Sequence, residues 1–381
     1  MLEIGLIFRV NAIFMIQDRQ QQMKRPSGID ENNTFYLTNT VFAQDHNFQA
    51  ELQTDLNTIR KTPGIVDAIQ INAIPLSGGG WSMSLQLEPG EDKDAIGSAL
   101  YMVDEHGINT MGLTLIAGEN FSQEDIQWRG EGQSKWPPKT IITKAFASQL
   151  FPDDWQSAIG KTFYISQSQP MQIIGIVEAL QAPWNGWDGV ERSMLVPFQM
   201  ESSSSYYLIR TEAGKRDQMM PIIEKELAER NKGRIIRRVT TIEDTRKRSY
   251  RQHNATNKIL TTVVTTLTLI TSFGIVGLAI FSINRRTKQI GTRRALGANR
   301  WQIMRYFMVE NFIISAVGVI IGSLAAVGLN MWLVSTFNLT PISFKLVLFG
   351  VVTLFLVGQL AVLYPARKAA LIPPATATRT I

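Results

Sequence analysis

The chain has 381 residues and no cysteine, which excludes thiol chemistry, disulfide bonds and cysteine-based metal sites. Its net charge of +6 is unevenly distributed. Residues 30–255 hold 22 basic and 29 acidic side chains, whereas residues 256–381 hold 12 basic side chains and one acid. Because the positive charge is confined to short segments beside apolar stretches, the charge pattern does not support a nucleic-acid-binding function.

The chain begins with a short, mainly apolar segment. Residues 4–17 are interrupted by Arg9, and Asp18 and Arg19 follow where a signal peptide would have a small-residue cleavage site. A bilayer span needs about 20 residues. We therefore interpret residues 1–17 as part of a first transmembrane helix whose beginning is missing from this sequence. An arginine in mid-membrane costs about 2.5–3.5 kcal/mol on insertion scales, so Arg9 should reach the interface or face a partner helix.

Residues 18–240 mix helix and strand patterns and predict an α+β domain, with turn-rich sequence between 76 and 140 that suggests two lobes. Helices are expected at 48–61, 143–150 and 215–231. Strands are expected at 66–74, 82–88, 97–104, 162–166, 171–178, 193–197 and 205–211. Trp184 and Trp187 could form a contact site, but capping of the core beneath a loop is the favoured interpretation.

Residues 241–258 predict a polar stalk helix. Thr240-Thr241-Ile242-Glu243 has the spacing of a capping box, and the residues that follow are strongly polar. We expect this helix to continue into the next apolar stretch as one rod, which could transmit movement between the domain and the other side of the membrane.

Three long stretches without charge follow the stalk, at residues 259–284, 311–344 and 346–366. From them we predict transmembrane helices at 259–284, 307–336 and 345–366. At about 1.5 Å per residue, each exceeds the roughly 30 Å of a hydrocarbon core. A turn at residues 338–341 should separate the last two helices. Three such stretches so close together make buried helices of a soluble core the weaker interpretation.

The segment between the first two of these helices sets the orientation. Residues 285–306 hold seven Lys and Arg side chains and no acid, so the positive-inside rule places them in the cytoplasm. The basic tail, residues 367–381, falls on the same side. Residues 18–240 then lie outside, which predicts a multi-pass protein of the cell inner membrane with a large periplasmic or extracytoplasmic domain.

The sequence shows no catalytic motif. Ile159-Gly160-Lys161-Thr162 is similar to the end of a phosphate-binding loop, but Trp155 occupies the position that must be glycine. The three histidines lack metal-binding spacing, and there is no GxSxG nucleophile motif. We therefore expect no enzymatic activity, no catalytic residue, no metal and no cofactor in this chain.

The basic segment has its own local pattern. The helix of residues 259–284 should continue to about Leu296, where Gly297 suits the left-handed position after a helix end. Asn299 is a good N-cap for a new helix from Arg300. Electrostatic anchoring to anionic lipid, worth about 1 kcal/mol per basic side chain, is the simpler alternative. It does not require these glycines or their order.

Two motifs resemble those of a known family. Residues 289–298 read QIGTRRALGA and are followed by FMVE at 307–310, and residues 364–370 read YPARKAA. These resemble the signatures of FtsX-like permeases of the MacB type, although Gln289 replaces the usual glutamate and the cytoplasmic helix before the first span is missing. The MacB-type periplasmic core is resembled in three places, at residues 74–78, at 112–125, and at 151–152 with 159–161 followed by 173–177.

The resemblance implies a membrane α-helical protein with four transmembrane helices, the first truncated, and an α+β periplasmic core domain inserted between helices 1 and 2. It implies the permease subunit of an ABC transporter that couples ATP hydrolysis on a separate cytoplasmic ATPase to movements of the outer domain (mechanotransmission) for efflux or extrusion. Its partners would be that ATPase, which binds the ATP, the lipid bilayer, and a second permease in a homodimer or heterodimer. A periplasmic adaptor is a further candidate partner. The alternative is a non-transporting membrane regulator that signals to an extracytoplasmic enzyme.

The resemblance assigns ATPase coupling to the basic segment, namely Arg286, Lys288, Ile290, Gly291, Arg293, Arg294, Ala295, Leu296, Gly297 and Arg300. The C-terminal motif contributes Tyr364, Pro365 and Arg367. Glu310, at the membrane interface, could pair with the basic loop or serve in coupling. Gly318 and Gly322 have small-xxx-small spacing, which favours close helix packing.

Overall fold

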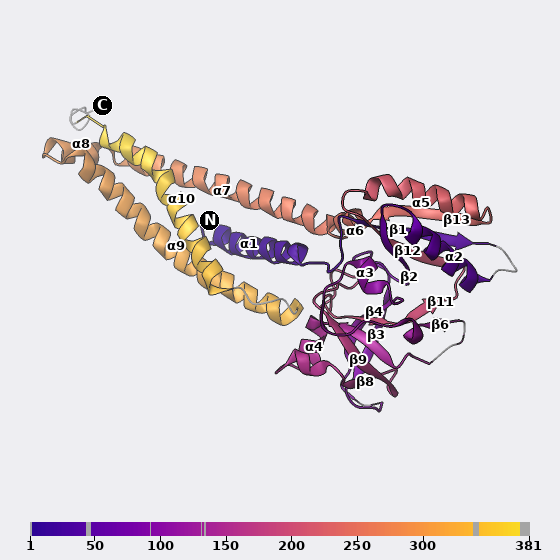
Figure 1. The fold of residues 1–381 in the computed structure, drawn as a ribbon. Coiled ribbons are helices and arrows are strands. Elements are labelled where there is room, and N and C mark those ends of the chain that lie inside the picture. The colour runs from indigo at the N-terminus through magenta and orange to yellow at the C-terminus, as the bar shows by residue number, and fades with distance from the viewer. Residues whose placement is uncertain are drawn as a thin grey trace. The chain divides into compact units, whose positions relative to one another are not determined.

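The computed structural model describes residues 2–42, 47–91, 93–130, 132, 135–337 and 343–373. The chain divides into two compact units (Figure 1). The helical unit comprises Met1–Met23 and Gln252–Ile381, and the outer domain comprises Lys24–Arg251. Each unit is described separately below.

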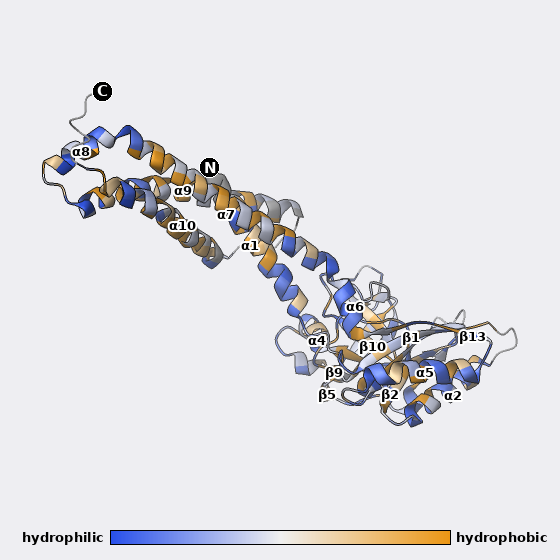
Figure 2. Ribbon diagram, turned by 90° about the horizontal axis from the view of Figure 1, so that it is seen from above, coloured by the Kyte–Doolittle hydropathy of each residue, from blue (hydrophilic) through white to orange (hydrophobic). Residues whose placement is uncertain are grey.

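The helical unit contains the long apolar helices. They are α7 (Arg251–Arg285), α9 (Arg300–Phe337) and α10 (Phe344–Ala370), and by length and composition each could cross a membrane. Figure 2 shows hydrophobic residues along all three and hydrophilic residues around α8 (Thr287–Ala295). Within the described residues α1 (Leu2–Lys24) does not meet the same criteria, so the total of four spans stays a prediction. The turn predicted at 338–341 lies outside the described residues.

Helix ends differ from the predictions in three places. The stalk and the next helix were expected to form one continuous rod, but one residue separates α6 (Ile242–Ser249) from α7. The residue between them, Tyr250, buries its ring in the outer domain, and this burial accounts for the interruption. At its other end α7 stops at Arg285 and does not continue to Leu296. Helix α10 continues through Pro365 to Ala370, into the segment predicted as tail.

Arg9 of α1 is buried against α7. Its Nη2 donates to the carbonyl oxygen of Leu267 at 2.7 Å and to Oγ1 of Thr271 at 2.9 Å. The neighbouring Val10 packs with Val319 of α9 and Val347 of α10. The prediction that Arg9 faces a partner helix is therefore confirmed.

The outer domain contains a four-stranded antiparallel sheet in the order β13-β1-β12-β2. The strands are β1 (Thr34–Val41), β2 (Ile65–Ile71), β12 (Ser204–Thr211) and β13 (Arg234–Thr241). The helices α2 (Phe48–Lys61) and α5 (Arg216–Arg230) supply one side of a core in which Leu56 and Ile223 pack with Phe35 and Ile209 of the sheet.

A second, mixed sheet has seven strands in the order β5-β9-β7-β10-β4-β3-β8. Strand β8 pairs with both β3 and β9, so six of the strands close into a ring. The bounds are β3 (Trp81–Gln86), β4 (Ile96–Met102), β5 (Leu115–Gly118), β7 (Lys139–Thr143), β8 (Thr162–Ile165), β9 (Gln169–Val177) and β10 (Ser193–Val196). Shorter elements are α3 (Gly107–Met111), α4 (Lys144–Leu150), two 3-10 turns (Gln123–Asp125 and Trp155–Ala158) and the pair β6 (Gln127–Arg129) and β11 (Phe198–Met200).

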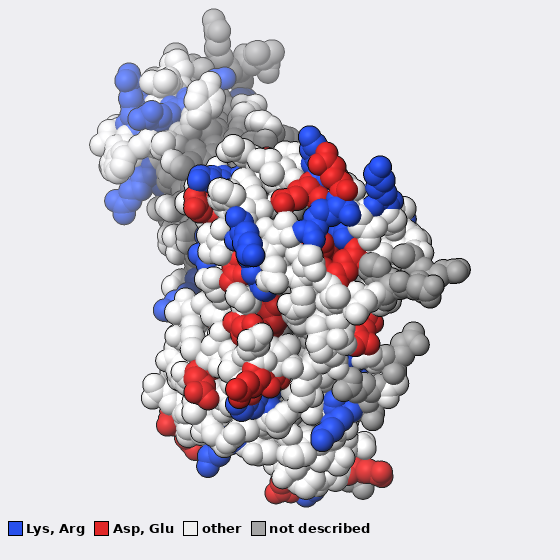
Figure 3. All heavy atoms as spheres, turned by 45° about the vertical axis from the view of Figure 1, so that its right-hand side comes forward, with Lys and Arg blue, Asp and Glu red and all other residues white. Residues whose placement is uncertain are grey.

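The two sheets share one hydrophobic core, to which Ile69 and Leu208 of the first sheet and Tyr101 and Leu195 of the second contribute. The rings of Trp184 and Trp187 meet edge-to-face, with 6.1 Å between their centroids. Both rings pack against this core, as expected for residues that cap it. On the face shown in Figure 3, acidic and basic side chains of the outer domain are interspersed.

Polar contacts also join the two sheets. Asp67 of β2 lies 3.0 Å from Nδ1 of His106, which follows β4, and 3.2 Å from Nε of Arg60. Arg60 also binds Asp104 at 3.0 Å. The hydrogen bond to Asp67 raises the pKa of His106 above its ordinary value. The protonated histidine is therefore favoured in the folded outer domain.

We predict a pH-dependent contribution from His106. Its stabilising effect should be complete below the unfolded pKa of about 6.5 and should be lost as pH rises through the raised folded pKa. Unfolding free energies of the purified chain and of the His106→Gln variant should therefore differ most at acid pH and converge at alkaline pH. His253→Gln, in the helical unit, is the comparison: burial lowers the pKa of His253, so its substitution should give a pH trend of the opposite sign. A His106→Gln difference that does not change with pH would contradict the prediction.

A buried ion pair holds β13 to α2. Arg234 donates from Nη1 to Oδ2 of Asp55 at 2.7 Å, and both side chains are almost fully buried. Tyr207 donates its hydroxyl to the same carboxylate at 3.0 Å. Burial raises the pKa of Asp55, whereas the hydrogen bond and the charge of Arg234 lower it. The ionised form of Asp55 therefore depends on Arg234.

Removing Arg234 alone should therefore be costly. The Arg234→Met variant leaves the buried carboxylate of Asp55 with the more distant Arg230, at 3.8 Å, as its cation and should lose about 3–5 kcal/mol of unfolding free energy. The double variant Arg234→Met with Asp55→Leu should recover most of that loss, and Arg237→Met, at an exposed position of the same strand, should change little. Urea unfolding followed by tryptophan fluorescence measures all three; an equal loss in the single and double variants would be inconsistent with this account.

Candidate functional site

The turn after α8 has the hydrogen bonds of a Schellman motif. The N–H of Ala298 donates to the carbonyl oxygen of Arg293 at 3.0 Å, and the N–H of Gly297 to that of Arg294 at 3.2 Å. Gly297 has φ +96°, a conformation that side-chain-bearing residues rarely adopt. The predicted left-handed position of Gly297 after the helix end is confirmed, and its part in ATPase coupling stays a prediction.

The next helix is capped by two reciprocal hydrogen bonds. The N–H of Gln302 donates to Oδ1 of Asn299 at 2.8 Å, and the N–H of Asn299 donates to Oε1 of Gln302 at 2.9 Å. This is a capping box, which satisfies two backbone donors at the start of α9. The predicted N-cap and the helix start at Arg300 are confirmed.

One face of α8 is buried against the other helices of the helical unit. Ile290 and Gly291 are inaccessible, and Ile290 packs with Phe307 of α9 and with Val362 and Ala366 of α10. These two members of the predicted coupling set therefore hold α8 against α9 and α10. The side chain of Ile290 is therefore not presented to a partner, and Gly291 has no side chain to present.

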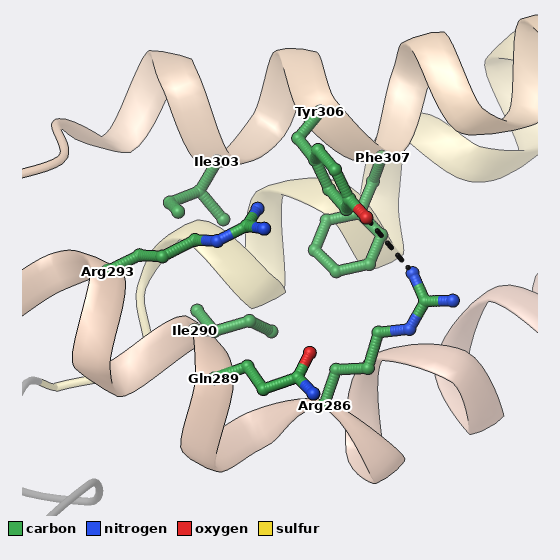
Figure 4. Close-up of a pocket in the computed structure, with 7 residues that line it drawn as sticks. All are labelled: Arg286, Gln289, Ile290, Arg293, Ile303, Tyr306 and Phe307. Atoms are coloured by element: carbon green, nitrogen blue, oxygen red, sulfur yellow. Dashed lines mark hydrogen bonds between the residues drawn. The ribbon is translucent and has the colours of Figure 1, made fainter.

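Tyr306 of α9 contacts two arginines: Arg293 lies over its ring, and Arg286 donates to its hydroxyl (Figure 4). The guanidinium of Arg293 lies 4.7 Å from the ring centroid, and Nη1 of Arg286 is 3.3 Å from the hydroxyl. The pocket between these side chains has a volume of about 10 Å³, roughly enough for one water molecule. The side chains fill the space between α8 and α9, so this pocket is too small to be a ligand site.

Glu310 accepts from Arg286. Nη1 of Arg286 lies 2.9 Å from each carboxylate oxygen of Glu310, and both side chains are partly exposed. Of the two roles considered for Glu310, pairing with the basic segment is thus observed. The pair joins the α7–α8 junction to α9.

An exposed surface, here called the Leu–Trp patch, consists of Leu296, Arg300, Trp301 and Leu371. Leu296, Trp301 and Leu371 are 83%, 63% and 60% exposed. A groove of about 370 Å³ is lined by Trp301 and Leu371 and by two arginines, Arg300 and Arg367. Sequence reasoning missed Trp301 and Leu371, although a large apolar residue within a charged segment is a usable signal.

The remaining predicted residues have varied environments. Lys288 and Ala295 are exposed, and Nη1 of Arg294 reaches the carbonyl oxygen of Ala298 at 3.5 Å. Tyr364 is exposed, whereas Pro365 is buried. Gly318 and Gly322 are buried on the face of α9 that also carries Val319, so this small-residue face packs within a single chain. Among the described residues, no cluster of His, Asp and Glu suits a metal ion.

Comparison with known proteins connects this region to a family. Residues 261–374 match the family described as "FtsX-like permease C-terminal". The chain is 24% identical over 400 residues to the uncharacterized ABC transporter permease YknZ of Bacillus subtilis, a match that covers 99% of this chain and 93% of YknZ. It is 27% identical over 291 residues to the macrolide export ATP-binding/permease protein MacB of Campylobacter jejuni. That match covers 71% of this chain and 43% of MacB, so the chain spans less than half of this relative.

Two solved structures show a weaker likeness. The periplasmic region of MacB from Actinobacillus actinomycetemcomitans is 15% identical with a TM-score of 0.36, over 60% of this chain and 97% of that one. The extracellular domain of YknZ is 17% identical with a TM-score of 0.34, over 53% of this chain and 100% of that one. Together with the sequence matches, the family match confirms the resemblance to FtsX-like permeases of the MacB type.

The Schellman turn gives a direct prediction. A Cβ added at Gly297 or at Gly328 of α9 would meet no heavy atom within 4 Å, but only Gly297 has a positive φ. Gly297→Ala should therefore destabilise its turn by about 1–2 kcal/mol and speed hydrogen exchange of the Gly297 and Ala298 amides roughly 5- to 30-fold. Gly328→Ala should leave those amides unchanged. Equal exchange rates in the two variants would show that the turn does not require glycine.

Proposed function

We propose that this chain is the permease subunit of an ABC-type transporter in the cell inner membrane, with its outer domain on the extracytoplasmic side. A separate cytoplasmic ATPase binds ATP and docks on the basic segment, and its movements reach the outer domain to drive efflux or extrusion of a substrate. The family match and the similarity to YknZ and MacB support this assignment. The three apolar helices and the basic residues between α7 and α9 support the orientation.

The observation that carries the proposal is the Leu–Trp patch. Leu296 and Trp301 are exposed on a segment that the positive-inside rule places in the cytoplasm. Exposed apolar side chains bordered by charge mark protein interaction sites. Arg300 and Arg367, at the edge of the same groove, favour a partner surface with an apolar hollow and acidic surroundings.

The packing beneath the patch is suited to transmitting force. Ile290 fixes α8 to α9 and α10, and the Arg286–Glu310 pair fixes the α7–α8 junction to α9. A displacement of α8 would therefore move the ends of all three long helices together. We assign partner contact to the patch and a supporting role to Ile290, Gly291 and Gly297.

The second permease of the dimer, homologous or identical, and the periplasmic adaptor rest on the family resemblance alone. Part of the small-residue face of α9 is already occupied within the chain. A dimer contact would therefore use other surfaces, such as the exposed side chains Phe273, Leu278 and Phe281 of α7.

The proposal predicts a co-purifying ATPase. When the full chain is purified in mild detergent from its native host, ATP hydrolysis should accompany it, because the patch binds the ATPase. Leu296→Asp, which places a charge in the apolar contact, and Trp301→Ala should each reduce the associated activity by about tenfold or more, as expected for truncation of an interface anchor.

The matched control is Trp332→Ala. Trp332 is 57% exposed and lies near the other end of α9, so it tests loss of a tryptophan from the same helix without touching the patch. This variant should retain the ATPase. Absence of any associated ATPase, or its retention by Leu296→Asp, would contradict the proposed docking.

A further inference from the structure

A second surface, in the outer domain, has the character of a ligand site. A pocket of about 610 Å³ lies among β1, β13, α6 and the loops at 76–78 and 183–185. This volume is within the range of small-molecule sites. Tyr36, Leu76, Pro183 and Trp184 give it apolar walls, and Arg238 and Arg248 give it positive charge. No acidic side chain of the described residues lines it.

Arg238 occupies a β-bulge. Tyr36 pairs with Thr240 and Thr38 pairs with Arg237, so Arg238 and Val239 together oppose the single residue Leu37. Arg238 has φ +52°, a left-handed conformation that glycine adopts without strain and arginine does not. Bulges re-aim side chains, and here the bulge residue lines the pocket.

A second left-handed residue lines the same pocket. Leu76 has φ +63° and is buried. Its N–H donates to the carbonyl oxygen of Ala182 at 3.2 Å, which fixes one loop on the other. Asn185 then donates from Nδ2 to the carbonyl oxygen of Ser249 at 2.9 Å and ties the second loop to the end of α6. The walls are therefore held in place before any ligand arrives.

The two arginines of the pocket differ from their neighbours. Arg246 of α6 pairs with Glu31, Arg216 with Glu243, and Arg234 of β13 with Asp55. In the part of the chain that the structure describes, the guanidinium groups of Arg238 and Arg248 have neither an ion pair nor a hydrogen bond. Two free guanidinium groups beside an indole ring form a receptor for an anion attached to a flat apolar group.

We propose that this pocket binds an anionic ligand, a carboxylate or phosphate on an aromatic or other apolar body. Arg238 and Arg248 hold the anion, and the body lies against Trp184 and Tyr36. The outer domain alone carries all of these residues, so the site does not depend on the proposed ATPase partner and the two experiments can fail independently.

The test uses the full chain in phosphatidylcholine nanodiscs, with 2-naphthyl phosphate as probe and calorimetry as readout. Saturable binding is expected, with neutral 2-naphthol and inorganic phosphate each binding more weakly because each lacks one half of the ligand. Arg238→Gly and Arg248→Ala should each weaken binding about tenfold, the loss expected for one charge-assisted hydrogen bond. Arg237→Ala removes the same charge from the neighbouring, exposed position and should bind as the unaltered chain does.

Arg238→Gly separates binding from folding. Glycine relieves the left-handed strain, so the thermal midpoint of this variant should be unchanged or higher while binding is lost. Nanodiscs of phosphatidylglycerol distinguish the source of the anion: competition by the lipid identifies a headgroup as occupant, and unchanged binding identifies a soluble ligand. No saturable binding, or equal affinity in Arg238→Gly, overturns the proposal.

Discussion

Cations that leave water need an acceptor inside the protein, because an isolated buried charge costs far more than the chain can offset. This constraint recurs in both units. Arg9 of α1 reaches a carbonyl oxygen and a threonine hydroxyl of α7, Arg234 reaches the buried Asp55, and Arg60 binds two carboxylates between the sheets. Most of these pairs join elements that are far apart in the sequence; the Arg60–Asp67 pair, between the consecutive elements α2 and β2, is the exception. Much of the tertiary arrangement therefore follows from where arginines find their partners.

The same constraint identifies the arginines with other roles. Arg238, Arg248 and Arg300 have no ion pair or hydrogen bond to their guanidinium groups among the described residues, and all three are exposed. Two of them line the pocket of the outer domain, and the third borders the groove of the Leu–Trp patch. Surface arginines are common and cost little, but here they coincide with apolar rings and concave surfaces. That coincidence, and not the charge alone, suggests binding.

The sequence predicted what depends on neighbouring residues. Long uncharged stretches indicated α7, α9 and α10, and short apolar runs bounded by turn residues indicated β4, β9 and β12. It failed for β1 and β13. Strand β13 reads RIIRRVTT, whose three arginines look like a solvated loop, and it becomes a strand because β1 pairs with it and Asp55 neutralises Arg234. Neither partner is near in sequence, so no local pattern could show it.

The basic segment divides in the same way. Gly297 and Asn299 act through their own backbone neighbourhood, and their roles were predictable from turn and cap chemistry. The burial of Ile290 depends on Val362 and Ala366 of α10, which lies beyond α9 in the chain. The local motif therefore could not indicate this burial. The motif also drew attention to its arginines and away from Trp301.

The exposure of Leu296 and Trp301 has a consequence for the cell. Apolar side chains of this size, left uncovered in an aqueous compartment, attract other uncovered surfaces and invite aggregation. A copy made without its partner would carry that hazard for as long as it remains alone. Under the docking proposed above, balanced synthesis of the two subunits, or rapid removal of the unaccompanied one, would be as much a requirement of the patch as its fit to the proposed ATPase.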